Sequence, residues 1–168
     1  MGVKGKQPGM DREALLEMAR LAATRAYAPY SRFRVGAAVV VSEPGGERVV
    51  TGANVENASF GLTLCAERAA LAAALTSVPS DGRGPSASSA LPVISQVAVA
   101  CIDAPADATA GQRAPCGACR QWLAELAPDA AYYIDGLPGH YHLDDLLPLA
   151  FRTVPSLGPG VPPPPDGA

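Results

Sequence analysis

The sequence predicts an α/β fold in which a mixed sheet is covered by helices on both faces. Two observations lead to this prediction. An amphipathic helix is followed by two β-rich runs joined as a hairpin, and helices then alternate with strands along the rest of the pattern. With 48% hydrophobic residues, the 168-residue chain is also long enough to bury the core of one domain.

The first half contains a helix, a hairpin and a second helix. A helix is predicted over residues 11–27, where apolar residues recur at helical spacing behind acidic first-turn residues, and "PYSRF" ends it. Two β-rich runs, 34–42 and 47–55, are joined by "EPGG", which is a strong hairpin signal. The Ala-rich run "LCAERAALAAAL" then predicts a short, largely buried helix.

The second half continues the alternation. Residues 77–92 have the composition of a loop, and 96–102 form a buried strand of Val and Ala. A helix begins at Pro115, which occupies the natural first position for proline. "AYYID" predicts another strand, and "HLDDLLPLAF" predicts a short final helix.

The chain is predicted to form one domain with a flexible segment at each terminus. Residues 11–153 form the domain, 1–10 are expected to be flexible, and the Pro-rich 154–168 to be disordered. The sequence contains neither a membrane-length apolar run nor a recognisable secretory signal, so we expect a cytoplasmic protein without a membrane partner. The net charge of −3, with scattered Lys and Arg, favours a small-molecule partner over nucleic acid.

Four cysteines require an explanation: Cys65, Cys101, Cys116 and Cys119. A reducing compartment argues against disulfides. Cys101 lies in the apolar run "QVAVACID" and is predicted to be a core residue. Cys116 and Cys119 share one helix face in a first turn, where the helix dipole favours thiolates. They could form a redox dithiol or half of a metal site, but the surrounding pattern is not thioredoxin-like.

A third thiol and a carboxylate favour a catalytic metal site. Cys65 also lies at a helix start, and three thiolates leave tetrahedral Zn²⁺ with one open position. The alternative is a closed structural site in which His140 or His142 is the fourth ligand. Glu67 follows Cys65 by two residues, the general layout of zinc deaminases. Since positions i and i+2 do not share a helix face, we expect a departure from mid-helix geometry there.

Three thiolates weaken zinc as a Lewis acid unless other groups withdraw negative charge from the sulfurs. Arg68 and Arg120 each adjoin a residue of this cluster and are candidates to hydrogen-bond sulfur. Either arginine could instead lie at the surface or in an interface.

With these residues in place, the sequence resembles the small, free-nucleoside type of cytidine deaminase. The resemblance runs from Leu15 to Phe151 and rests on "YSRFRVGAA", "TGANVENASFGLTLCAERAA", "PCGACRQWL" and "LLPLAF". It implies a three-layer α/β/α fold with a mixed five-stranded sheet and one Zn²⁺ per subunit. It also implies hydrolytic deamination of cytidine and 2′-deoxycytidine to uridine and 2′-deoxyuridine, with release of ammonia, in pyrimidine salvage.

The same resemblance implies roles for individual residues. Glu67 shuttles protons, and Glu56 accepts hydrogen bonds from ribose hydroxyls while repelling phosphate. In a homotetramer, aromatic residues are expected to reach neighbouring subunits. The implied zinc ligands are Cys65, Cys116 and Cys119; the implied substrate contacts are Phe33, Asn54, Glu56 and Ala66; the implied cross-subunit contacts are Phe60 and Phe151.

Other functions remain open at this point. A deaminase of a cytosine antibiotic such as blasticidin S shares the scaffold, although "NVENA" favours an ordinary ribose. A polynucleotide editor is disfavoured by the acidic balance, and a zinc-stabilised interaction domain by the unligated Glu67. Two loops, 77–92 and 103–114, look longer than the family's usual connections, and the second leads directly into Pro115.

Overall fold

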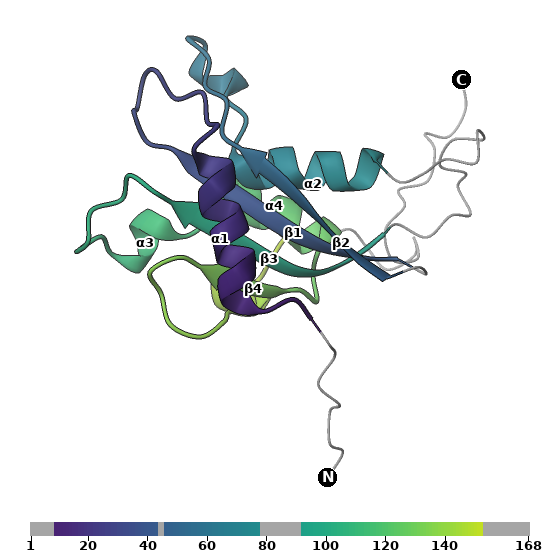
Figure 1. Cartoon of the computed structure of the whole chain (residues 1–168). Helices are drawn as coiled ribbons and strands as arrows, with labels where there is room; N and C mark the ends of the chain where they lie inside the picture. Colours follow the sequence, from purple (N-terminus) through teal and green to yellow (C-terminus); the bar gives the residue numbers. More distant parts are fainter. Residues whose placement is uncertain (1–8, 44–45, 78–91, 153–168) are drawn as a thin grey trace, which may run out of the picture.

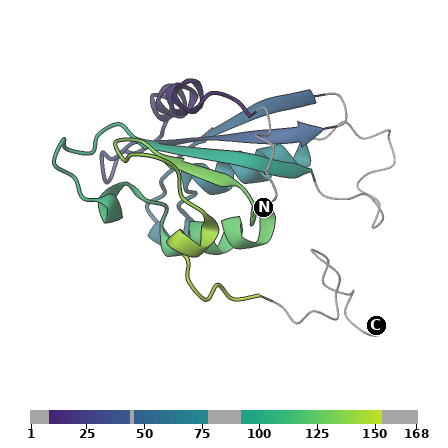
Figure 2. The same ribbon diagram turned by 90° about the horizontal axis from the view of Figure 1, so that it is seen from below.

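A computed structural model describes residues 9–43, 46–77 and 92–152 as three layers. One helix covers one face of the sheet, and three helices cover the other (Figures 1 and 2). Residues 1–8 of the predicted flexible start, the Pro-rich tail and nearly all of the 77–92 loop lie outside the described residues. Met10, at the end of that predicted start, packs against the core on the α1 face. The helices are α1 (Arg12–Ala23) on the first face, and α2 (Ala66–Thr76), α4 (Gly117–Leu126) and α5 (Leu143–Leu146) on the second.

The described sheet is mixed, as predicted. Its strand order is β2-β1-β3-β4. Strand β1 pairs antiparallel with β2 and β3, whereas β3 and β4 run parallel. The strands are β1 (Val35–Glu43), β2 (Gly46–Ala53), β3 (Val93–Cys101) and β4 (Ala131–Ile134).

The expectation of five strands was wrong, because the described residues form four. After β4, Tyr141 makes a single bridge to Tyr132, with both N–H···O distances at 2.8–2.9 Å. Gly136 and Gly139 have φ values of 79° and 70°, so the chain turns sharply on both sides of Pro138. Proline also has no N–H for a ladder, and a fifth strand therefore does not extend along β4.

The helices differ from the predicted pattern in two places. Helix α1 ends at Ala23 rather than near residue 27, because Tyr27 pairs with the chain at Asn54 and Glu56 instead. A short helix, α3 (Ala110–Arg113), lies in the segment expected to be a loop. In the described residues, no helix has the length and apolarity needed to cross a membrane.

Strand β1 is buried on both faces, which explains its continuous apolar run. Ala37, Val39 and Val41 face the cluster formed with α2 and α4. Ala38 and Val40 face α1. The central strand thus joins both cores and supports the start of α2.

Helix α2 lies very close to the sheet at Gly52. A Cβ there would lie 2.5 Å from Ala70 N and 2.6 Å from Ala66 O. We expect Gly52→Ala to lower the free energy of unfolding by about 1–3 kcal/mol, the usual cost of overpacking. Urea unfolding measures this, with Gly111→Ala as control because its Cβ would meet nothing within 4 Å. Equal losses in both variants would contradict this close approach.

An ion pair connects α1 to the end of β4. Arg20 donates to Asp135 from Nε at 3.0 Å and from Nη2 at 2.6 Å. These bonds lower the pKa of Asp135 from its ordinary 3.8. Since the folded pKa is depressed, its stabilisation is present above about pH 4 and is lost as pH falls through the folded pKa.

We therefore expect Asp135→Asn to destabilise the protein by about 1–2 kcal/mol at pH 7. The difference from wild type should shrink below about pH 4. Urea unfolding at pH 7 and pH 3 tests this. A difference that is equal at both pH values would mean that the carboxylate charge does not contribute.

Candidate active site

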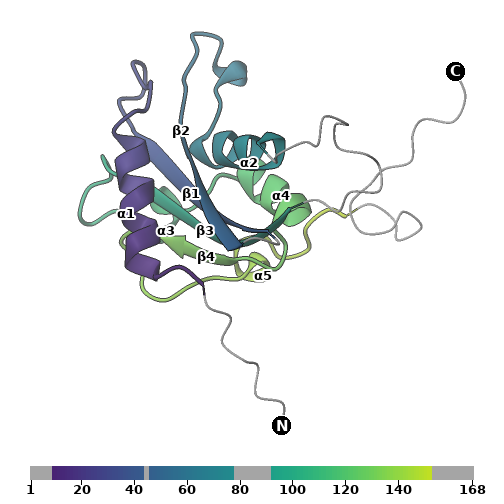
Figure 3. The same ribbon diagram turned by 45° about the vertical axis from the view of Figure 1, so that its right-hand side comes forward.

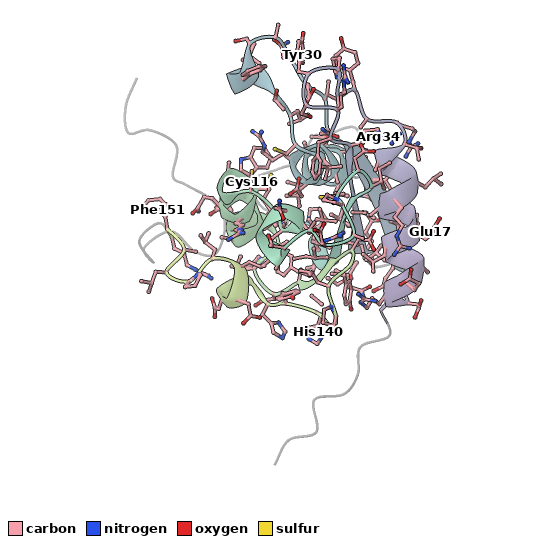
Figure 4. The ribbon with its side chains drawn as sticks, turned by 90° about the vertical axis from the view of Figure 1, so that its left-hand side faces the viewer. Glu17, Tyr30, Arg34, Cys116, His140 and Phe151 are labelled. Carbon is pink, nitrogen blue, oxygen red and sulfur yellow. The ribbon has the colours of Figure 1, made fainter. Side chains whose placement is uncertain are left out.

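The N-termini of α2 and α4 meet at one point, and a cysteine precedes each helix. Cys65 and Cys116 are the N-cap residues, with extended ψ values of 152° and 165°. Their sulfurs lie 3.9 Å apart. Figure 4 shows Cys116 beside this junction. Since the positive ends of both helix dipoles point here, the junction favours anionic ligands.

The N-cap position of Cys65 confirms the expected departure from helix geometry. Cys65 lies outside the helix with β-type backbone, so Glu67 is only the second helical residue. The i, i+2 rule for mid-helix faces therefore does not apply, and both side chains line the same cavity.

The three predicted thiols fit one zinc ion per subunit. The sulfurs of Cys65, Cys116 and Cys119 all lie within 4.8 Å of one another. Tetrahedral Zn–S bonds of about 2.3 Å require sulfurs roughly 3.8 Å apart. The donor set is also the soft one that zinc prefers, and three crowded thiolates need a cation to offset their mutual repulsion.

Hydrogen bonds prepare one of these thiols for ionisation. The Cys119 thiol and the Arg68 guanidinium hydrogen-bond Cys65 and lower its pKa to about 5. As the donor to Cys65 and a buried group, Cys119 has a raised pKa. Metal binding must displace that proton, because thiolates are the ligands.

Of the two candidate arginines, only Arg68 contacts a sulfur atom of the cluster. Arg68 Nη2 lies 3.6 Å from the Cys65 sulfur and also donates to Thr63 O at 2.8 Å. Arg120 instead donates to Pro115 O and Leu146 O, at 2.7 and 2.8 Å. Arg120 thus fixes the turn before Cys116 against α5, rather than donating to sulfur.

A cavity of about 460 Å³ opens in front of the thiols. Nucleoside-sized ligands occupy cavities of this order. Ala66 is fully buried and is not one of the lining residues. Phe60 and Phe151 are exposed and also lie outside the lining. The predicted residues that line the cavity are Phe33, Asn54, Glu56, Cys65, Glu67 and Cys116.

Glu67 is a buried carboxyl in the lining of this cavity, with 4% of its surface exposed. Burial raises its pKa above the usual range, and the nearby Cys65 thiolate adds to the rise. A raised pKa makes the ionised carboxyl a stronger proton acceptor, which suits a group that must accept and return a proton.

Glu56 is the other carboxylate in the cavity lining. Its oxygens accept hydrogen bonds from the Ser31 hydroxyl and from the backbone N–H groups of Tyr30 and Ser31. The Ser31 hydrogen bond is the largest cause of its lowered pKa. Glu56 therefore stays ionised and acts as a hydrogen-bond acceptor.

The Asn54 side chain hydrogen-bonds the backbone on both sides of Arg34, next to the cavity-lining Phe33. Its Oδ1 accepts from Val35 N at 2.8 Å, and its Nδ2 donates to Phe33 O at 3.0 Å. The side chain thus links β1 to the end of β2 and fixes the position of Phe33.

Several lining residues were missed by the sequence reasoning. Cys101 is buried as predicted and is not one of the three clustered thiols, but it also lines the cavity. The expectation that the 103–114 loop is longer than the family's usual connections was the available signal for a further group at its end. The lining residues that were not predicted are Ser31, Val35, Thr63, Val99, Cys101, Gln112, Arg113 and Ala114.

The histidines form a separate group. The rings of His140 and His142 are 5.0 Å apart, and His140 packs against Tyr133. Figure 4 shows His140 well away from Cys116. Among the described residues, the metal-capable cluster contains only the three thiols, so the closed four-ligand site is not formed there.

Three thiols on two helix N-termini, with a buried carboxyl beside them in an open cavity, define a zinc-dependent hydrolytic enzyme. Comparison with known proteins narrows this class. The family profile described as "Cytidine and deoxycytidylate deaminase zinc-binding region" matches residues 10–134. The chain belongs to this family.

Named relatives agree with this assignment. The chain is 42% identical to a cytidine deaminase of Halalkalibacterium halodurans over 86% of this chain and 96% of that protein. One of Mycobacterium tuberculosis is also 42% identical, over 86% and 92%. The crystal structure of the Burkholderia pseudomallei cytidine deaminase superposes with a TM-score of 0.65 at 41% identity, covering 84% of this chain and all of that one.

Proposed function

We propose that this chain hydrolyses cytidine and 2′-deoxycytidine to uridine and 2′-deoxyuridine, releasing ammonia. The observation that carries the proposal is the placement of buried Glu67 and the thiol cluster in one cavity that also contains ionised Glu56. A neutral nucleoside offers an amino-bearing base for Glu67 and ribose hydroxyls for Glu56. The relatives' activity supports the same substrate class over a cytosine antibiotic.

Glu67 is the proposed proton carrier. Zinc held by Cys65, Cys116 and Cys119 supplies a Lewis acid that makes water acidic enough to ionise near neutral pH. Glu67 takes the proton released by water and delivers it to N3 of cytosine. As the water oxygen bonds to C4, the base becomes tetrahedral at that carbon. Glu67 then takes the proton of the new C4 hydroxyl and gives it to the amino group, so the C4–N bond breaks, ammonia leaves and the C4 carbonyl of uridine remains. The net change consumes one water for each ammonia formed.

The remaining contacts hold the nucleoside in place. Phe33 stacks against the pyrimidine, and Ala66 contacts the base through its backbone. Asn54 and Glu56 bind the ribose, and the negative charge of Glu56 disfavours a phosphorylated sugar. Arg68 withdraws charge from the Cys65 sulfur, with which it is already in contact.

We infer a homotetramer in which neighbouring subunits complete each site. Figures 1 and 3 show that the loops around Tyr30 and Phe60 project beyond the sheet. The two rings pack at 6.0 Å, and 75% of the Phe60 surface is exposed. Phe60 and Phe151 are the proposed cross-subunit contacts. Aromatic side chains are enriched at subunit interfaces, where association would bury them.

The proposed catalytic domain spans residues 11–153, and the proposed location is the cytoplasm. All four cysteines lie in the described residues and are free thiols. A reducing compartment keeps such closely spaced thiols available as ligands.

A direct assay tests the proposal. Zinc-loaded protein is incubated with cytidine while ultraviolet absorbance and ammonia are followed, and zinc is quantified in the same sample. We expect ammonia equal to uridine, at one zinc per subunit. If the protein deaminates blasticidin S faster than cytidine, the substrate is the antibiotic rather than the nucleoside. If an RNA oligomer inhibits the reaction at a concentration below that of cytidine, the substrate is a polynucleotide. No ammonia from the zinc-loaded protein would refute it.

A further inference from the structure

The 103–114 segment forms a wall of the cavity that is anchored at its start. Asp103 accepts three hydrogen bonds from Arg34: from the backbone N at 2.8 Å, from Nε at 2.9 Å and from Nη2 at 2.6 Å. Arg34 directly follows Phe33, so this pair joins the wall to the aromatic side of the cavity.

The end of the segment is anchored by Arg113. Its Nη2 donates to Pro105 O at 2.7 Å, and its Nε donates to Ala108 O at 3.4 Å. The guanidinium also packs over Gly136, where a Cβ would come within 2.8 Å of Nη1. Helix α3 is therefore held against the end of β4, although it has only one turn.

The capping box of α3 determines how Gln112 faces the cavity. Gln112 Oε1 accepts from Thr109 N at 2.8 Å and from Thr109 Oγ1 at 3.0 Å. The opposite amide orientation would place an NH₂ group against a backbone N–H, which cannot accept a hydrogen bond. The oxygen is thus committed, and Nε2 has no protein acceptor within the described residues. Gln112 is also one of the cavity-lining residues.

We propose that Gln112 is a substrate-binding residue whose Nε2 donates a hydrogen bond to an oxygen of the bound nucleoside. The inference rests on the proposed function. It complements Glu56, which can only accept hydrogen bonds. A nucleoside presents hydroxyl protons to the carboxylate and acceptor oxygens, on the base carbonyl and the sugar, to the amide. An uncharged donor also suits a neutral substrate.

Gln112→Glu separates this role from helix capping. Glutamate is a usual capping-box residue, so it keeps the acceptor for both Thr109 donors but lacks the N–H. We expect KM for cytidine to rise about three- to tenfold with kcat within twofold, the pattern of a binding contact. Ala110→Glu, which adds the same charge on the exposed turn outside this cavity, should leave both constants unchanged.

A KM for Gln112→Glu within twofold of wild type, or a rise equal to that of Ala110→Glu, would overturn the proposal. Parallel assays with 2′-deoxycytidine identify the acceptor: equal rises in KM indicate an oxygen common to both nucleosides, and a rise with cytidine alone indicates the 2′-hydroxyl. Both results support the donor role. An inactive wild type would instead refute the proposed function, so the two failures are distinguishable.

Discussion

Replacement of Glu67 with glutamine is expected to lower kcat for cytidine by about 10²- to 10⁴-fold while the protein keeps its fold and its zinc. The amide has nearly the same shape but cannot carry a proton, and general acid–base groups contribute rate factors of this size. Burial of Glu67 and its raised pKa suit it to accept and return a proton. The variant should also be no less stable, because a buried charge is removed.

Steady-state kinetics, zinc analysis and urea unfolding of the same preparation test this expectation. Glu125→Gln is the matched control, since it makes the same chemical change on the exposed side of α4. Normal turnover by Glu67→Gln would remove Glu67 from the mechanism. Loss of zinc from that variant would instead mean that the carboxylate supports the metal site.

Replacement of Cys116 with alanine is expected to abolish zinc retention and, with it, activity. Two thiolates remain, and the helix α4 N-terminus loses its contact with the Cys65 sulfur. Zinc that binds only the folded state stabilises it by about 4 kcal/mol at a thousandfold excess over Kd. The variant should lose this zinc-dependent part of the free energy of unfolding.

Metal analysis after dialysis and melting with and without a chelator measure both effects. In wild type the chelator should lower Tm, whereas in Cys116→Ala it should have little effect. Cys101→Ala is the control, because Cys101 is buried in the same region but is not part of the thiol cluster. Full zinc retention by Cys116→Ala would contradict the three-thiolate site.

The thiol cluster and the neighbouring carboxyl were predictable because these residues lie in local patterns. The C-x-x-C at the start of α4 and the C-x-E at the start of α2 each mark a helix N-terminus, where thiolates and carboxylates have a physical reason to occur. Strand β1 likewise follows from the unbroken run without polar side chains at residues 35–41. The fifth strand came from resemblance alone, and the turns at Gly136 and Gly139 oppose it.

The residues that were not predicted depend on contacts distant in the sequence. Gln112 lies in a segment that reads as a loop, and it faces the cavity only because Arg34 and Arg113 hold that segment in place. Arg68 and Arg120 both follow motif residues, but only Arg68 contacts sulfur. Arg120 instead donates hydrogen bonds to the carbonyl oxygens of Pro115 and Leu146.

By itself, the sequence determined the mixed α/β architecture, the three clustered thiols and the carboxyl beside them, because these follow from periodicity and from residue types at fixed spacing. Only the tertiary structure decided that Cys65 and Cys116 cap two adjoining helices, which brings their sulfurs to 3.9 Å. It also decided which arginine faces the metal site and that α3 closes one side of the cavity. These outcomes depend on packing between elements that are far apart in the sequence, and a local sequence pattern does not predict such packing.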